Sequence, residues 1–162
     1  MSHKNVLAVD FGASSGRVML GNFDGNRLSI QEIHRFPNDP VILNGTMYWD
    51  FLRLFYEVKQ GLMKAKKYGK IDSIGVDTWG VDFGLIDKEG NLLENPVHYR
   101  DARTAGMLEK SFGKMDKDRF YQITGSQFME INTVFQLLAL LEKRPGLLEG
   151  TSRLLLMPDL FN

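Results

Sequence analysis

Cysteine is absent from the 162-residue sequence, and 20 basic residues balance 20 acidic ones, so the chain carries no formal net charge. Without cysteine there are neither disulfide bonds nor thiolate metal sites. The balanced charge argues against a broad surface for nucleic acid. No apolar run approaches the roughly 20 residues of a membrane-spanning helix, and the first residues do not resemble a signal peptide. With 43% hydrophobic and 25% charged residues, the composition indicates a globular cytoplasmic domain that binds neither nucleic acid nor membrane.

A strand that runs directly into a loop of small residues is the most informative feature of the chain. The apolar run 6–10 ends in an acid, Asp10. The loop that follows consists of Gly12, Ala13, Ser14, Ser15 and Gly16, and Arg17 comes next. Because these residues leave the backbone open, its N–H groups can approach a phosphate, and the two hydroxyls add donors. Asp10 is suited to a hydrated divalent cation that bridges phosphate oxygens. The loop therefore predicts a phosphate site.

Neither of the two familiar phosphate-loop patterns fits this loop. A Walker A sequence needs Lys and then Ser or Thr after its second glycine, whereas Arg17 follows Gly16 here. A dinucleotide fingerprint needs three glycines that lead into a helix, whereas this loop has two and leads into the apolar run 17–21. What remains is a hairpin whose tip holds phosphate, as in the ATPase fold of sugar kinases, actin and the 70-kDa chaperones. An ordinary hairpin turn is the alternative.

A second segment places a tryptophan and a glycine between two strand-like runs. The runs 71–76 and 81–86 flank Trp79 and Gly80, with acids nearby that include Asp82. An indole can cover the apolar face of a sugar ring, glycine permits close approach, and carboxylates accept hydrogen bonds from hydroxyls. The segment is therefore a candidate sugar site. The alternative is that Trp79 belongs to the core and that the acids only form turns.

Four segments together resemble the rhamnulokinase branch of the FGGY carbohydrate kinase family. They are residues 9–18, 75–85, 98–104 and 123–137, and the matches run in order along the whole chain. The resemblance implies an α/β fold of the actin-like ATPase (ribonuclease H-like) class, with a mixed sheet flanked by helices. It also implies ATP-dependent phosphorylation of L-rhamnulose to L-rhamnulose 1-phosphate in rhamnose catabolism, with ATP and Mg²⁺ as cofactors.

The resemblance also implies roles for particular residues. Asp10 would organise Mg²⁺ through water, and Ala13, Ser14, Ser15, Gly16 and Arg17 would bind the phosphates of ATP. Gly80, Trp79 and Asp82 would line the sugar site. Weaker candidates for sugar contact are Tyr99, Arg100, Asp101, Arg103, Gln127, Asn132 and Thr133, several of which suit helix capping equally well.

The length of the chain limits what it is expected to do alone. The family's enzymes have two actin-like domains, so we interpret residues 1–162 as a truncated N-terminal domain that is inactive by itself. The family's catalytic aspartate lies in the second domain, and no catalytic residue is expected in this chain. The whole enzyme is expected to be a monomer. Alternatives are a kinase for L-fuculose, xylulose or glycerol, an actin-like nucleotide switch, and a sugar sensor without catalysis.

Periodicity and turn residues predict the elements of this domain. Strands are expected at 6–10, 17–23, 27–36, 71–76 and 81–86, with a tight turn at 24–26 and a loop over 37–45. Asp50 is expected to cap a helix whose core stripe comprises Phe51, Phe55, Val58, Leu62 and Ala65. Further helices are expected at 103–112, 116–123 and 133–143, the last one capped by Asn132 and ended by Pro145.

Overall fold

The computed structural model describes residues 3–162, which divide into two compact units. The first unit comprises the residues up to Val41, Trp49–Gly80 and Met157–Asn162. The second unit comprises Ile42–Tyr48 and Val81–Leu156. The chain therefore passes from the first unit to the second directly after Gly80, inside the segment that the sequence marks as a sugar site.

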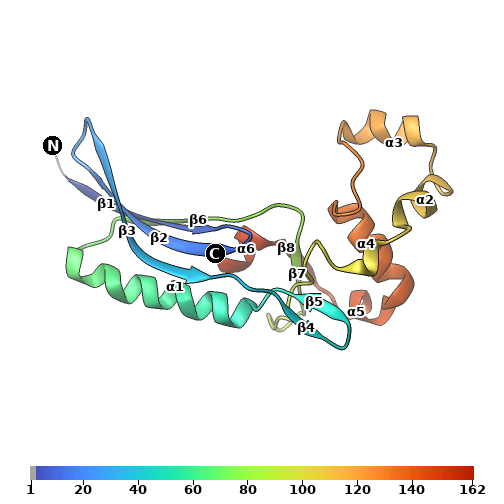
Figure 1. Ribbon diagram of the computed structural model, residues 1–162, viewed down its shortest axis with the longest axis horizontal. Coiled ribbons are helices and arrows are strands. Elements are labelled where there is room, and N and C mark those ends of the chain that lie inside the picture. The colour runs from blue at the N-terminus through green and yellow to red at the C-terminus, as the bar shows by residue number, and fades with distance from the viewer. Residues whose placement is uncertain (1–2) are drawn as a thin grey trace. The chain divides into compact units, whose positions relative to one another are not determined.

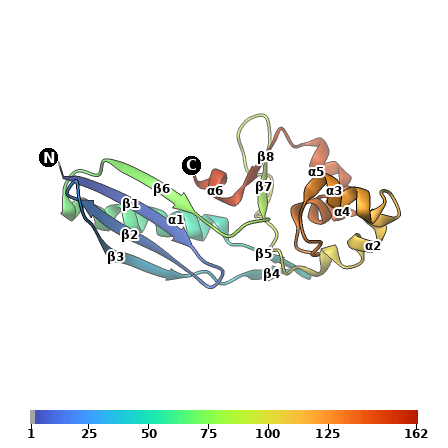
Figure 2. The same ribbon diagram turned by 90° about the horizontal axis from the view of Figure 1, so that it is seen from above.

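Four strands form the sheet of the first unit, in the order β3-β2-β1-β6 (Figure 2). β1 (Lys4–Phe11) pairs antiparallel with β2 (Ser15–Phe23), which pairs antiparallel with β3 (Leu28–Pro37). On its other side β1 pairs in parallel with β6 (Ser73–Asp77). The mixed sheet implied by the resemblance is confirmed, and the four strands expected in this unit are present with ends that differ by a few residues.

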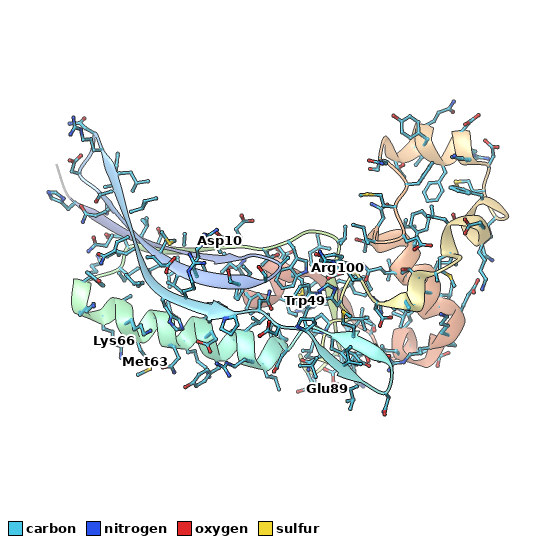
Figure 3. All side chains as sticks on the ribbon, viewed as in Figure 1. Asp10, Trp49, Met63, Lys66, Glu89 and Arg100 are labelled. Carbon is cyan, nitrogen blue, oxygen red and sulfur yellow. The ribbon has the colours of Figure 1, made fainter. Side chains whose placement is uncertain are left out.

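Helix α1 (Phe51–Ala65) lies along one face of this sheet (Figure 1). Successive residues of a strand point to opposite faces, and Leu7, Val9 and Phe11 of β1 are at most 3% exposed. They form one hydrophobic cluster with residues of β2 and α1. Asp10 lies between the last two of them in the chain and therefore points away from α1, as Figure 3 shows.

The short helix α6 (Met157–Phe161) adds to the same cluster. Its Phe161 ring stacks on Phe11, with ring centroids 4.4 Å apart, and also approaches Phe51 at 4.9 Å. Aromatic pairs at such distances gain about 0.5–1.5 kcal/mol beyond simple burial. Helix α6 thus packs against β1, the strand that leads to the predicted phosphate loop.

The core stripe predicted for α1 is partly wrong. Phe55 is 41% exposed, whereas Leu54 and Gly61 are buried together with Val58 and Ala65. Val58 and Ala65 belong to the predicted stripe, whereas Leu54 and Gly61 lie one residue before the predicted Phe55 and Leu62. The helix is turned this way because Gly61 lies against the sheet, and Met63 and Lys66, labelled in Figure 3, lie on the outer side.

A buried charged group links α1 to β3. Glu57 is 5% exposed and accepts hydrogen bonds from His34 Nε2 at 2.7 Å and Arg53 Nε at 2.6 Å. Lys64 Nζ donates to His34 Nδ1 at 2.8 Å, an arrangement that places the imidazole proton on Nε2. Burial raises the pKa of Glu57, but the hydrogen bonds from His34 and Arg53 outweigh it and leave that pKa below its ordinary value. The backbone N–H of Arg53 donates to the side chain of Asp50, which caps the helix as expected.

The second unit contains most of the helices and two short strand pairs. β7 (Phe83–Ile86) pairs antiparallel with β8 (Arg153–Leu156). The helices are α2 (Met107–Phe112), α3 (Lys117–Thr124), α4 (Thr133–Lys143) and α5 (Pro145–Glu149), preceded by the 3₁₀ turn η2 (Ala102–Thr104). Within residues 3–162, none of the helices is both long and apolar enough to cross a membrane.

Residues 37–45 are not the plain loop that the sequence predicts. They include β4 (Val41–Leu43), which pairs with β5 (Thr46–Tyr48). Asn44 and Gly45 between them have φ values of +50° and +77°, which match the tight turn of a two-residue hairpin. The sequence did not reveal these strands, because each has only three residues and the proline, asparagine and aspartate residues before them favour a loop.

Two helix predictions are also corrected. The helix expected at 103–112 is interrupted at Gly106, where a φ of +76° is incompatible with helix, so only the 3₁₀ turn and α2 form. Asn132 occupies the N-cap position of α4 but makes no capping hydrogen bond from its side chain. Its Oδ1 instead accepts from the Met129 N–H at 2.7 Å, because the preceding turn folds back onto it.

The close approach of α1 to the sheet predicts unequal effects of two Gly→Ala substitutions. A Cβ at Gly61 would lie 2.3 Å from Val18 Cγ2, whereas at Gly146 in α5 no atom lies within 4 Å. Overpacking costs about 1–3 kcal/mol, more than the ~0.5–1 kcal/mol that alanine gains over glycine in a helix. We expect G61A to lower the free energy of unfolding by about 1–2 kcal/mol in urea titrations. The matched control G146A should leave it unchanged or raise it, and a G61A protein as stable as the parent would contradict this packing.

Candidate functional site

The hairpin tip between β1 and β2 is held in shape from within and by Asn38. Gly12 N donates to Ser15 O at 2.9 Å, and Asn38 N donates to Ser14 O at 3.1 Å. The Asn38 side-chain amide also donates to the Gly12 carbonyl at 2.8 Å, and Asn38 is only 2% exposed. Ala13 and Ser14 remain exposed at the tip. The fixed backbone there is accessible to an anionic ligand.

Gly16 is placed by packing, unlike the exposed residues of the tip. It is buried, and a Cβ there would lie 2.3 Å from the ring of Phe36. The predicted phosphate loop thus combines residues that shape it with residues that a ligand can reach. No sequence pattern marks Asn38 as part of the loop, because an asparagine after Pro37 is typical of any polar connection.

Strand register brings four charged side chains into one row at the end of the sheet next to this tip. Asp10 pairs with Arg17 on one side and Asp77 on the other, and Arg17 pairs with Arg35. Arg17 Nη2 lies 2.7 Å from Asp10 Oδ2, and Arg35 forms an ion pair with Glu32. Because residues paired across a sheet point to the same face, the row shares the face of Asp10, which is labelled in Figure 3. A phosphate at the tip would therefore meet a guanidinium, and its cation would meet carboxylates.

The described residues hold no preformed cluster of metal-binding side chains. Among residues 3–162, no group of three or more His, Cys, Asp or Glu side chains is arranged to hold a metal ion. Asp10, near the end of β1, is the carboxylate closest in sequence to the hairpin tip. Asp77 of β6 is its partner in the strand register. The half-buried Asp10 and the exposed Asp77 suit a hydrated Mg²⁺ that is carried by a nucleotide.

Trp79 and Gly80 follow β6 and are the last residues of Trp49–Gly80, a segment of the first unit. The Trp79 ring packs on the fully buried Trp49, with ring centroids 3.9 Å apart, and it borders the main hydrophobic cluster. Trp79 is half-buried, so it supports the core and still presents part of its ring. Gly80 is exposed, and a Cβ there would meet no atom within 4 Å. Packing within the chain therefore does not require glycine at this position.

Asp82, predicted to line the sugar site, is almost completely buried. It is 1% exposed, and its Oδ1 accepts from Gln136 Nε2 at 2.9 Å while its Oδ2 accepts from the Tyr99 N–H at 3.1 Å. Both carboxylate oxygens are thus engaged by the protein. The arrangement favours a role in positioning the surrounding backbone over direct contact with a sugar.

Val81 has a φ of +70°, which ends the strand expected from 81 and delays β7 to Phe83. Its carbonyl accepts from Thr133 Oγ1 at 2.8 Å and from Gln136 Nε2 at 3.3 Å. Gln136 is 1% exposed and also donates to the Ile131 carbonyl at 2.9 Å. The start of α4 therefore fixes the backbone around Val81. A glutamine within the otherwise apolar run 134–141 is the sequence signal that could have identified Gln136.

Arg103 and Asp101 complete this buried polar network. Arg103 Nη2 donates to Gln136 Oε1 at 2.6 Å, and burial lowers the pKa of Arg103 despite the opposing charges of Asp101 and Asp82. Within the part of the chain that the structure describes, the buried Arg103 Nε has no hydrogen-bond partner. Asp101 accepts from the N–H groups of Met47 and Arg103 at 2.8 and 2.9 Å. These bonds give both residues structural roles.

The remaining residues at the start of the segment 98–104 divide between surface and interior. Arg100 is exposed (Figure 3) and places its guanidinium 5.4 Å from the centroid of the Tyr99 ring. The neighbouring His98 is buried and accepts from the Arg100 N–H at 2.9 Å through Nδ1. Burial, helped by the Arg100 charge, lowers the pKa of His98 to about 4. His98 is therefore neutral near pH 7, and of residues 98–100 only Arg100 is freely accessible.

A cavity of about 220 Å³ in the second unit brings several of the weaker candidates together. Its lining combines hydroxyl and amide side chains with aromatic rings: Val81, Phe120, Thr124, Ser126, Gln127, Phe128, Asn132, Thr133, Val134 and Phe135. Drug-sized ligands fill roughly 300–1,000 Å³, so this space suits a smaller polar molecule. A larger groove of about 530 Å³ between α2, α3, α4 and α5 is lined almost entirely by apolar side chains and offers little to a polyol.

Comparison with known proteins identifies the family. The N-terminal domain of the FGGY family of carbohydrate kinases matches residues 5–162, and the chain belongs to this family. It is a homologue of the rhamnulokinase of Oceanobacillus iheyensis, with 43% identity over 157 residues that cover 96% of this chain and 33% of the relative. The chain thus spans about a third of the length of that curated relative. The family and branch implied by the sequence motifs are confirmed.

Solved structures confirm the fold class. The gluconate kinase of Lactobacillus acidophilus superimposes with a TM-score of 0.80 at 16% identity, over 95% of this chain and 31% of that one. The xylulose kinase of the same organism gives a TM-score of 0.78 at 16% identity, over 93% and 31% of the two chains. The actin-like fold of the FGGY N-terminal domain is therefore present, as the resemblance implies.

The two hydrogen bonds of Asp82 predict a large effect of its conversion to asparagine. In D82N the new amide N–H₂ would face one of two donors, the Gln136 amide or the Tyr99 N–H, and would break the hydrogen bond that this donor makes to Asp82. A hydrogen bond to a charged group contributes about 1.5–3 kcal/mol. We expect D82N to lower the free energy of unfolding in urea by about 2 kcal/mol. The same change at the exposed Asp39 is the control, and equal stability of D82N and D39N would refute the proposed pairing.

Proposed function

We propose that this chain is the N-terminal part of a rhamnulokinase, which transfers the γ-phosphoryl group of ATP to the primary hydroxyl of L-rhamnulose. The observation that carries the proposal is the 43% identity to a rhamnulokinase over nearly the whole chain. The closed hairpin tip beside a row of charged side chains supports it, because it offers a preformed site for phosphate. Residues 1–162 supply no catalytic base in this proposal, and the remainder of a longer polypeptide supplies it.

The proposed reaction uses the first unit to hold MgATP. FGGY kinases generally use ATP with Mg²⁺, and Asp10 would orient the hydrated ion that arrives with the nucleotide. The backbone of Ala13 and Ser14 would bind phosphate oxygens, and Arg17 would exchange part of its contact with Asp10 for phosphate. The hydroxyl oxygen of the sugar forms a bond to the γ-phosphorus while the bond to the β-phosphate oxygen breaks, so that ADP leaves. The hydroxyl proton passes to the base outside this chain.

The proposed sugar contacts are carried by Trp79, Gly80 and the segment that Asp82 supports. Gly80 is exposed, and without a side chain its backbone leaves room for a ligand to approach closely. The exposed part of the Trp79 ring suits the apolar face of a sugar. Asn132 lines the 220 Å³ cavity of the second unit with an amide that can bind hydroxyls. We further propose that the enzyme works as a monomer in the cytoplasm, where ATP is supplied.

Sugar-dependent release of ADP by the full-length protein that contains this chain tests the proposal. MgATP is offered with L-rhamnulose, L-fuculose, D-xylulose or glycerol, and the 162-residue chain serves as a control. We expect the highest kcat/KM with L-rhamnulose and no turnover by the 162-residue chain. Preference for another substrate would retain the kinase class but reject the rhamnulose assignment. ATP hydrolysis that ignores every sugar would favour an actin-like nucleotide switch.

Two glycines with equal steric freedom allow a matched test of the sugar site. A Cβ at Gly80 or at Gly75 of β6 would meet no atom within 4 Å, so neither G80A nor G75A should change the melting temperature appreciably. We expect G80A to raise the KM for the sugar about tenfold, the effect of losing close contact worth ~1.4 kcal/mol, and G75A to leave it unchanged. If both variants keep the parental KM, Gly80 does not approach the sugar.

A further inference from the structure

Val81 holds a backbone conformation that a β-branched residue normally avoids. Its φ of +70° lies in the left-handed region, where Cβ crowds the backbone and where glycine is favoured. Asn44, the other such residue in the described chain, is of a type that tolerates this region. Strain of this kind persists only where the surrounding structure enforces it, and it concentrates at ligand sites.

The first turn of α4 supplies the groups that enforce this conformation. Thr133 Oγ1 and Gln136 Nε2 both donate to the Val81 carbonyl, at 2.8 and 3.3 Å. Gln136 Nε2 also lies 2.9 Å from Asp82 Oδ1, so one helix holds two successive residues. Arg103 Nη2 in turn donates to Gln136 Oε1 at 2.6 Å and orients its amide. The peptide between Val81 and Asp82 is thereby fixed from one side.

We propose that Thr133 and Gln136 are positioning residues that hold Val81 in the left-handed conformation and thereby set the affinity for the sugar. The link to the sugar rests on the proposed function. Val81 and Thr133 line the same cavity of about 220 Å³, whereas Gln136 is 1% exposed and outside its lining. Gln136 therefore acts through Val81 and Asp82. Thr133 acts through the Val81 carbonyl, with its hydroxyl turned to that oxygen.

A double-mutant cycle in the full-length protein that contains this chain tests the proposal. Removal of Gln136 would take one hydrogen-bond partner each from the buried Asp82 and from Arg103 and would threaten folding itself, so T133V is the better probe. V81G is the second variant, because glycine adopts a positive φ without support. T151V is the matched control, since Thr151 Oγ1 also donates to a carbonyl of the second unit, that of Leu147, at 2.8 Å and outside the cavity lining.

We expect T133V to raise the KM for the sugar about fivefold, as the loss of one hydrogen bond would, with kcat and the KM for ATP within about twofold. T151V should change none of these values. In the V81G background T133V should raise the KM for the sugar less than about twofold. Glycine at position 81 adopts the positive φ without strain, so its carbonyl does not need the hydrogen bond from Thr133. An equal T133V effect in both backgrounds would mean that Thr133 binds the sugar directly. A T133V protein that behaves like T151V would mean that it has no role, and either result overturns the proposal.

Hydrogen–deuterium exchange in the sugar-free protein separates this proposal from the proposed function. The peptide covering residues 78–83 should exchange faster in T133V than in the parent or T151V, and T133V should add no such increase in the V81G background. Unchanged exchange in T133V would overturn the positioning role, whatever the kinase activity. Faster exchange in a protein that phosphorylates no sugar would reject the proposed function and the link to sugar affinity.

Discussion

The register of β1 between β2 and β6 is the constraint on which the first unit depends. Because side chains alternate along a strand, burying Val9 and Phe11 against α1 forces Asp10 onto the opposite face. The same register aligns Asp10 with Arg17 and Asp77 at the end of the sheet. A slip of one residue would bury these charges and expose the core. The energy that folds the sheet therefore also places the charged row beside the hairpin tip.

The hairpin tip illustrates how packing and ligand access are combined in one loop. Gly16 is required by the ring of Phe36, and Asn38 ties two loop carbonyls together from a different segment. The exposed Ala13 and Ser14 lie between these fixed points. A loop held at both ends loses little conformational entropy when it binds phosphate. The hydrogen bonds that it makes to phosphate are therefore offset little by the cost of ordering the loop.

Much of the fold could be predicted from the sequence because local patterns carried it. The apolar run that ends at Asp10 located β1, and the cap at Asp50 located the start of α1. The errors arose where a long-range contact decided the outcome. Phe55 is exposed because Gly61, whose small size is useful only against Val18, fixed the rotation of the helix. The three-residue strands β4 and β5 were too short for any periodicity to show.

The candidate site was predictable in its motifs and not in its supports. The small-residue loop and the Trp79-Gly80 pair were visible as unusual local compositions. Asn38 and Gln136 were not identified, because each acts on a segment distant in sequence, and the burial of Asp82 follows from the same contacts. Sequence indicates which chemistry is present, whereas the positions of amide and carboxyl groups that orient it depend on tertiary packing.

A crystal structure of the full-length protein with L-rhamnulose and ADP bound would test the central claim most directly. The account predicts phosphate oxygens of ADP at the backbone of Ala13 and Ser14, and the sugar in contact with Gly80 and the ring of Trp79. It also predicts that Val81 keeps its positive φ in the complex. Nucleotide bound away from the hairpin tip, or a sugar that does not touch Gly80, would contradict it.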